Sequence, residues 1–180
     1  MSDWLDLVAE DAIDPERPIC DPHHHLWDHP YNRYLLPELL EDTQSGHNVV
    51  RTVFVECSSM YRKNGPDELK PLGETEFVNG VAAMSASGQY GGMHACDGIV
   101  SFADLTLGKK VGLVLDEHKR LSDRFRGIRH AAGWDPSDEV RNSHTNPPRS
   151  LYQNKDFLEG FQELADRQIT FDAWLYHHQI

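Results

Sequence analysis

Short apolar and β-branched runs alternate with amphipathic helical stripes along most of this sequence. The runs predict strands over residues 19–25, 52–56, 98–103, 125–131 and 170–176, and the stripes predict helices over residues 35–43, 74–86, 111–121 and 156–165. Strands that alternate with helices form a parallel sheet joined by helical crossovers. We therefore expect an α/β fold, whose sheet is either open and doubly wound or closed into a barrel.

The length of the chain bears on this choice. A closed barrel of eight strand–helix units typically needs about 250 residues, whereas this chain has 180 residues and five expected strands. No Gly-rich phosphate loop follows the first strand, which disfavours a dinucleotide-binding sheet. The long polar segment 135–154 is expected to be a functional rim or lid.

The overall charge disfavours one class of partner. The formal net charge is -12 at pH 7, and a surface that binds nucleic acid is basic, so we expect no nucleic-acid partner. No apolar run approaches the roughly 18 residues of a membrane-spanning helix. Residues 1–14 are acidic and lack the basic start and apolar stretch of a signal peptide. We therefore expect a cytoplasmic protein without a membrane partner.

The run Asp21-Pro22-His23-His24-His25 ends the first expected strand. Side chains alternate faces along a strand, so His23 and His25 are expected on one face and His24 on the other. Two imidazoles with this spacing can bind one cation, and the active sites of β/α barrels lie at the C-terminal ends of the strands. A polar strand end with structural histidines is the alternative, but the position on the first strand favours a functional pair.

Further strand ends supply candidates for the same site. His177 and His178 follow the fifth expected strand, and one of them is expected to face the barrel axis. Arg129 on the fourth strand can bind a substrate carboxylate through two parallel hydrogen bonds, or form an ordinary surface salt bridge. Glu56 ends the second strand and is either a metal ligand or acid, or a capping carboxylate.

Four separated segments of the chain resemble the amidohydrolase superfamily. They begin at Asp21, Gly73, Gly127 and Phe171 and read DPHHHLWD, GETEFV, GIRH and FDAWLYH. In this order they are most similar to the amidohydrolase-related branch that contains sugar-acid lactonases and the pyrone-dicarboxylate lactonase. The resemblance extends from residue 19 to the C-terminus.

The resemblance implies a distorted (β/α)8 barrel of the TIM type. Residues 19–180 would be its N-terminal part, with about five strands and truncated before strands six to eight, and residues 1–18 an N-terminal extension. In metal-using relatives, the histidines that match His23, His25 and His177 belong to the metal site. These three are therefore the expected catalytic residues and ligands of a divalent metal, zinc in the first instance, with Glu56 as a further ligand candidate. Some lactonases of this branch work without a tightly held metal, so a metal-free site is the alternative.

The resemblance also implies a function. We expect hydrolysis of a lactone of a small sugar-acid or carboxylate substrate, with Arg129 binding that substrate. The family's histidine after strand six and its aspartate after strand eight, which is expected to activate the water, have no counterpart, and His178 stands where relatives often have proline. A related decarboxylase is one alternative. A truncated, inactive fragment that needs a partner chain is another, and open sheet edges would then favour self-association.

Overall fold

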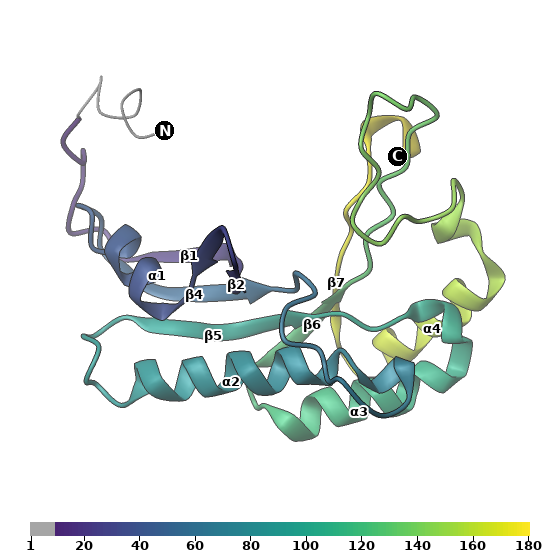
Figure 1. Cartoon of the computed structure of the whole chain (residues 1–180), viewed down its shortest axis with the longest axis horizontal. Helices are drawn as coiled ribbons and strands as arrows, with labels where there is room; N and C mark the ends of the chain where they lie inside the picture. Colours follow the sequence, from purple (N-terminus) through teal and green to yellow (C-terminus); the bar gives the residue numbers. More distant parts are fainter. Residues whose placement is uncertain (1–9) are drawn as a thin grey trace.

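A computed structural model describes residues 10–180 of the chain. Its centre is a five-stranded parallel sheet in the order β1-β4-β5-β6-β7. The strands are β1 (Ile19–His24), β4 (Val49–Val55), β5 (His94–Ser101), β6 (Phe125–Arg129) and β7 (Thr170–Asp172). Each strand of this sheet lies beside the one before it in the sequence, and the sheet curls into a half-barrel (Figure 1). The expected α/β class with five parallel strands is confirmed.

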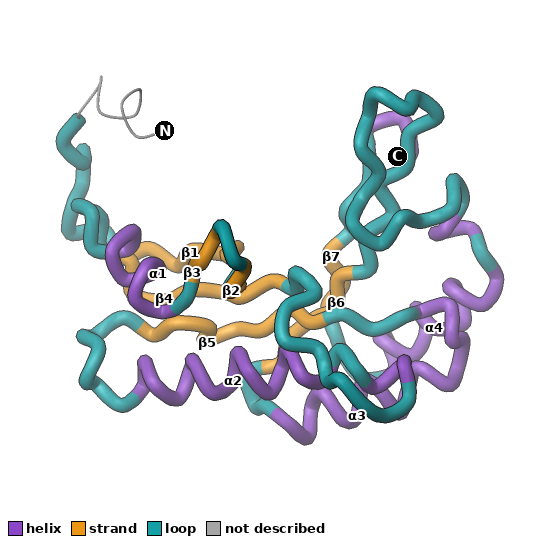
Figure 2. Tube along the Cα trace, viewed as in Figure 1, coloured by secondary structure: helices purple, strands orange, loops and turns teal. Residues whose placement is uncertain are grey.

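Helices cover one face of the sheet. The helices α2 (Leu72–Ala86), α3 (Val111–Leu121) and α4 (Lys155–Asp166) lie together below the strands in Figure 2. The helix α1 (Leu36–Thr43) joins the apolar cluster of α2 at one end of the sheet, next to a small hairpin. The loop after β6 and the last residues of the chain rise together at the other end (Figure 2). Short 3-10 turns complete the described elements: η2 (Asp67–Leu69), η3 (Leu105–Lys110), η4 (Leu151–Gln153) and η5 (His177–Gln179).

Two apolar clusters hold the helices to the sheet. One packs Phe54 of β4 and Ile99 of β5 against Val78 of α2 and the leucines of α1. The other packs Ile128 of β6 against Leu115 of α3 and the apolar side of α4. Both clusters use strand residues that point toward the helices, so the ends of the strands remain available for a site.

Some expected boundaries differ from the observed ones. The hairpin of β2 (Trp27–His29) and β3 (Asn32–Tyr34) was not expected, because strands of three residues are too short to show a period. Strand β5 begins at His94, four residues before the predicted start, because polar residues at its beginning hide the strand pattern in the sequence. Strand β7 ends at Asp172, well before the expected residue 176. Beyond it the chain still follows its neighbour, since Ala132 N donates a hydrogen bond to Trp174 O at 2.8 Å.

Pro22 is accommodated by an irregularity in β1. The pairing of β1 with β4 shifts register between Asp21 and His24, and His23 N donates to Asp21 Oδ1 at 3.1 Å. A bulge tolerates a residue that lacks an N–H group, and β1 is also an edge of the described sheet. The proline therefore fits the strand without a lost ladder bond.

The described residues before β1 add no helix or strand to the fold. Residues 10–18 form no helix or strand, and residues 1–9 of the expected extension lie outside the described residues. Within residues 10–180, no helix is both long enough and apolar enough to cross a membrane.

Candidate active site

The histidine pair lies at the C-terminal end of β1. His23 Nε2 and His25 Nε2 are 3.3 Å apart, and the two rings meet edge to face with centroids 4.9 Å apart. His25 Nδ1 donates to Val55 O at 2.7 Å, so its Nε2 carries the lone pair and accepts the hydrogen bond from His23 Nε2. Partial burial lowers the pKa of His25, so this imidazole is neutral at pH 7.

His24 points to the other side of the strand, as the alternation of faces predicts. Its Nε2 lies 2.8 Å from Thr52 Oγ1 and 3.8 Å from Cys96 Sγ, in a buried position. Burial lowers the pKa of His24 to about 4. A neutral, hydrogen-bonded core histidine is the role expected for it.

The spacing of the two Nε2 atoms fits a shared cation. Two nitrogen ligands about 2.0–2.1 Å from a tetrahedral zinc ion are on the order of 3.3 Å apart, and the observed separation is 3.3 Å. A metal-ligating histidine typically donates its other ring N–H to a carbonyl oxygen or carboxylate, as His25 Nδ1 does to Val55 O. The pair therefore has the geometry of two ligands of one divalent ion.

Glu56 follows β4 and is fully buried. Its Oε1 accepts a hydrogen bond from Arg129 Nε at 2.7 Å, and its Oε2 lies 3.2 Å from His144 Nε2. Arg129 also donates through Nη2 to the Glu56 carbonyl oxygen. Burial favours a raised pKa for Glu56, but the hydrogen bond with His144 and the charge of Arg129 outweigh it and hold the pKa below its usual value. Both carboxylate oxygens are therefore engaged within the protein.

His23, His25 and Arg129 face one pocket of about 660 Å³ at the C-terminal ends of the strands. The pocket is lined by His23, His25, Trp27, Cys57, Arg129, His144, Asp172, Ala173 and Trp174. The guanidinium carbon of Arg129 lies 5.1 Å from the centre of the Trp174 ring, and the His144 ring stacks on the same indole at 5.8 Å. Three of the predicted site residues, His23, His25 and Arg129, are thus brought together.

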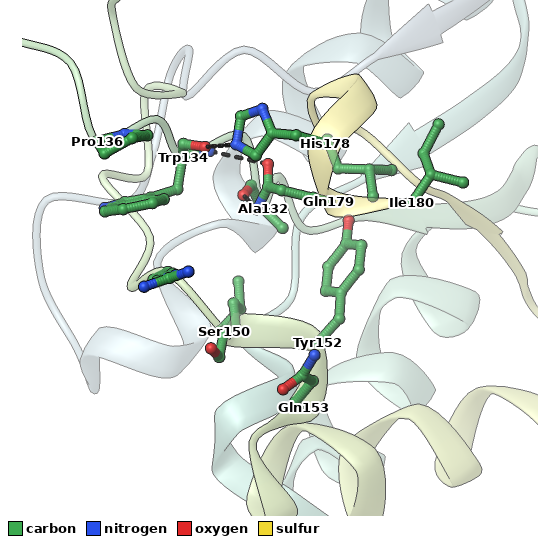
Figure 3. Close-up of a pocket in the computed structure, with 12 residues that line it drawn as sticks. Ala132, Trp134, Pro136, Ser150, Tyr152, Gln153, His178, Gln179 and Ile180 are labelled. Atoms are coloured by element: carbon green, nitrogen blue, oxygen red, sulfur yellow. Dashed lines mark hydrogen bonds between the residues drawn. The ribbon is translucent and has the colours of Figure 1, made fainter.

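The structure places His177 elsewhere. It is exposed in the turn η5 and does not line the pocket of His23 and His25. Its neighbour His178 lines a separate cavity of about 620 Å³, where His178 Nε2 donates to Trp134 O at 3.1 Å (Figure 3). Over residues 10–180 there is no group of three or more His, Cys, Asp or Glu side chains arranged to hold a metal ion.

Sequence reasoning did not single out the other lining residues of the pocket, among them His144 and Trp174. His144 comes from the long polar loop after β6, whose length was the available signal for a functional rim. The loop is anchored rather than loose, because Thr145 Oγ1 donates to Ala131 O at 2.9 Å and Ser143 N donates to Gly133 O at 2.8 Å. The segment therefore forms a fixed rim of the pocket.

One curated protein is similar in sequence to this chain. An uncharacterized protein of Sinorhizobium fredii, y4mH, is 30% identical over 184 residues, which is 90% of this chain and 55% of the relative. The chain therefore spans about half the length of the curated relative that it matches. No protein-family model matches the chain, and no solved structure matches it.

Proposed function

We propose that this chain contributes to the active site of a lactone-hydrolysing enzyme of the amidohydrolase-related branch, built on a (β/α)8 barrel of the TIM type. The observation that carries the proposal is the pair of Nε2 atoms of His23 and His25, 3.3 Å apart at the end of β1. Support comes from their location, because ligands and reactants of parallel α/β folds bind at the C-terminal ends of the strands. Arg129 lines the same pocket.

In this proposal His23 and His25 polarise the carbonyl group of the substrate. A divalent cation held by His23 and His25, zinc in the first instance, would act as a Lewis acid on the lactone carbonyl. In the metal-free alternative His23 Nε2 would donate a hydrogen bond to the same oxygen, because the Nε2 of neutral His25 can only accept one. In either case water adds to the carbonyl carbon, the ring C–O bond breaks, and a proton from the water ends on the leaving alkoxide. Arg129 keeps Nη1 for an oxygen of the substrate.

The remaining parts of this site are proposed to come from further strands. β1 and β7 are the two edges of the described sheet, and the matched relative is almost twice as long as the aligned part. Further polypeptide, from the same protein or from a partner chain, would close the barrel and bring the water-activating base. His177 stays a prediction, since it can join His23 only after the turn η5 moves.

Self-association through the sheet edges is the alternative way to cover them. Light scattering on the purified 180-residue chain distinguishes the two arrangements. A mass near twice 20.5 kDa would favour paired edges between copies, whereas a stable monomer would count against self-association.

The test of the function combines activity with metal binding. His23→Ala and His25→Ala are compared with His94→Ala, a control at an exposed position on β5 away from the pocket. In the protein that includes the further strands, we expect the first two variants to lower lactone ring opening, followed with a pH indicator, by at least about 100-fold, because losing a direct ligand should cost more than losing a residue that only orients a ligand. The same two variants should lose zinc binding in calorimetry. Unchanged turnover in His23→Ala and His25→Ala would refute the proposal, and carbon dioxide release from aromatic carboxylic acids without lactone consumption would assign the related decarboxylase.

A further inference from the structure

A second cavity is lined by the loop after β6, the turn η4 and the last residues of the chain. Its volume is about 620 Å³, a size typical of small-molecule sites. Trp134 and Pro136 lie on one side of it, and Tyr152 lies on the other (Figure 3). The residues that line this cavity and those that line the pocket of His23 and His25 form two sets without a common member, so the cavity is a separate candidate site.

Hydrogen bonds hold the walls of this cavity in place. Gln179 Oε1 accepts from Trp134 N at 3.1 Å, and Gln179 Nε2 donates to Ala132 O at 2.8 Å. On the other side, the hydroxyl of Tyr152 donates to His130 O at 3.0 Å. The cavity is therefore largely preformed, which lowers the entropic cost of binding a ligand.

Arg149 brings a positive charge to the cavity without a carboxylate partner. Its guanidinium carbon lies 5.6 Å from the centre of the Trp134 ring, and within residues 10–180 its side chain forms neither an ion pair nor a hydrogen bond. Contact with an indole face uses the charge of a guanidinium and needs no hydrogen-bond acceptor. The N–H groups of Arg149 are therefore available to bind a carboxylate through two parallel hydrogen bonds.

The charges around Arg149 favour a ligand with a single negative charge. Among the described residues, no Asp, Glu or Lys side chain lines the cavity. Asp135 lies outside the lining, where its Oδ1 accepts from Ser137 N at 2.9 Å and its Oδ2 lies 3.7 Å from His178 Nδ1. One guanidinium balances one negative charge, and a second charge would be repelled by a chain whose formal net charge is -12.

The other walls suit an apolar ligand body. Leu151, Leu175 and Ile180 line the cavity together with the ring of Tyr152. Small-molecule sites commonly combine such apolar walls with a few polar groups that fix the orientation of the ligand. Arg149 is the polar group that would orient a carboxylate here.

We propose that this cavity is a binding site for a small monocarboxylic acid with an apolar body, whose carboxylate pairs with Arg149 and whose body contacts Leu175 and Tyr152. The site is additional to the pocket of His23 and His25. It does not depend on the proposed lactone hydrolysis, because none of its residues lines that pocket.

The test is a binding experiment on the full chain with benzoate and benzamide, two probes of nearly the same shape that differ in charge. The chain has 4 tryptophans, whose ¹⁵N-labelled indole N–H signals are assigned with single Trp→Phe variants. Each probe is titrated at pH 7.5 and constant ionic strength, in a buffer free of carboxylate and phosphate. Inorganic phosphate serves as a third probe, an anion without an apolar body.

Benzoate should shift the indole signal of Trp134 and leave that of Trp174, in the pocket of His23 and His25, unchanged. Benzamide should bind at least about 10-fold more weakly, the equivalent of about 1.4 kcal/mol, because it cannot form a charge-assisted pair with Arg149. Phosphate should also bind more weakly than benzoate, since it makes no contact with the apolar walls.

Arg149→Gln should weaken benzoate binding at least about 10-fold and leave benzamide binding unchanged, because it removes only the charge-assisted pair. Arg141→Gln is the matched control. Arg141 is exposed in the same loop and does not line the cavity, so its loss should leave the binding of both probes unchanged. If Arg149→Gln fails to fold, the comparison of benzoate with benzamide on the unmodified chain still decides the question.

Equal or tighter binding of benzamide or phosphate would overturn the proposal. So would a shift at Trp174 in place of Trp134, an equal effect of Arg141→Gln, or no binding of benzoate up to its solubility. The outcome is separate from that of the hydrolysis assay, because His23→Ala should bind benzoate as the unmodified chain does.

Discussion

Glu56→Gln removes a buried negative charge and keeps the shape of the side chain. The side chains of Glu56 and Arg129 are 0% and 9% exposed, so the variant leaves the guanidinium in a site that water barely reaches. Removing one partner of a buried ion pair destabilises a protein by about 3–5 kcal/mol. For a chain of this size, that loss corresponds to a fall in Tm of about 6–20 °C.

The measurement is urea and thermal unfolding of the purified chain, with Glu76→Gln as the matched control. Glu76 pairs with Arg62 at the surface, where the side chains are 43% and 33% exposed, and its loss should cost about 0–1 kcal/mol. The double variant Glu56→Gln with Arg129→Met should recover part of the loss, because it removes the unpaired charge as well. A loss below about 1 kcal/mol in Glu56→Gln would refute the reasoning, since it would mean that water or another group compensates Arg129.

Three further predictions follow from the packing of the helices. Burial raises the pKa of Glu74 to about 7 from a usual 4.5, so between these two pH values the native state keeps a proton that the unfolded chain has lost. The free energy of unfolding should therefore fall by about 3 kcal/mol as the pH rises from 4.5 to about 7. Glu74→Gln should reduce this pH dependence, measured by urea titrations at several pH values. Burial lowers the pKa of His118 from 6.5 to about 4. The stability that the neutral, buried imidazole contributes should therefore be complete above pH 6.5 and be lost as the pH falls toward 4. His118→Gln should make the free energy of unfolding less sensitive to acid in the same assay. Gly160→Ala should lower the free energy of unfolding by about 1–3 kcal/mol, because its Cβ would meet Leu105 O at 2.2 Å, whereas Gly80→Ala, with nothing within 4 Å, should be neutral or stabilising in the same assay.

The local part of the site could be predicted from the sequence. The opposite directions of His23 and His24 follow from the two-residue period of a strand, which needs no knowledge of the rest of the fold. The position of Arg129 on the fourth strand was also predicted, from the run of residues 125–131, although the two arginines in that run weaken the strand pattern. Both features could be predicted because they depend on local sequence and backbone geometry and not on distant parts of the chain.

The partners of these residues could not be predicted. Glu56 and Arg129 are 73 positions apart, and their ion pair exists because β4 and β6 end at the same side of the sheet. His144 lies in a loop with no period and reaches Glu56 across 88 positions. His177 was expected beside His23, but β7 ends at Asp172, and from there the chain turns toward Trp134 through contacts of His178 and Gln179.

The strand order of the sheet also bears on how the chain folds during synthesis. Because each strand of the sheet pairs with the one before it, every strand that leaves the ribosome finds its neighbour already made. Pairing therefore needs only the closure of one crossover at a time, and the entropy of loop closure grows slowly with crossover length. The chain can build its sheet from β1 toward β7 as it emerges, with α2 packed on β4 and β5 and α3 packed on β6 before the strand that carries the chain to Trp174 has been translated.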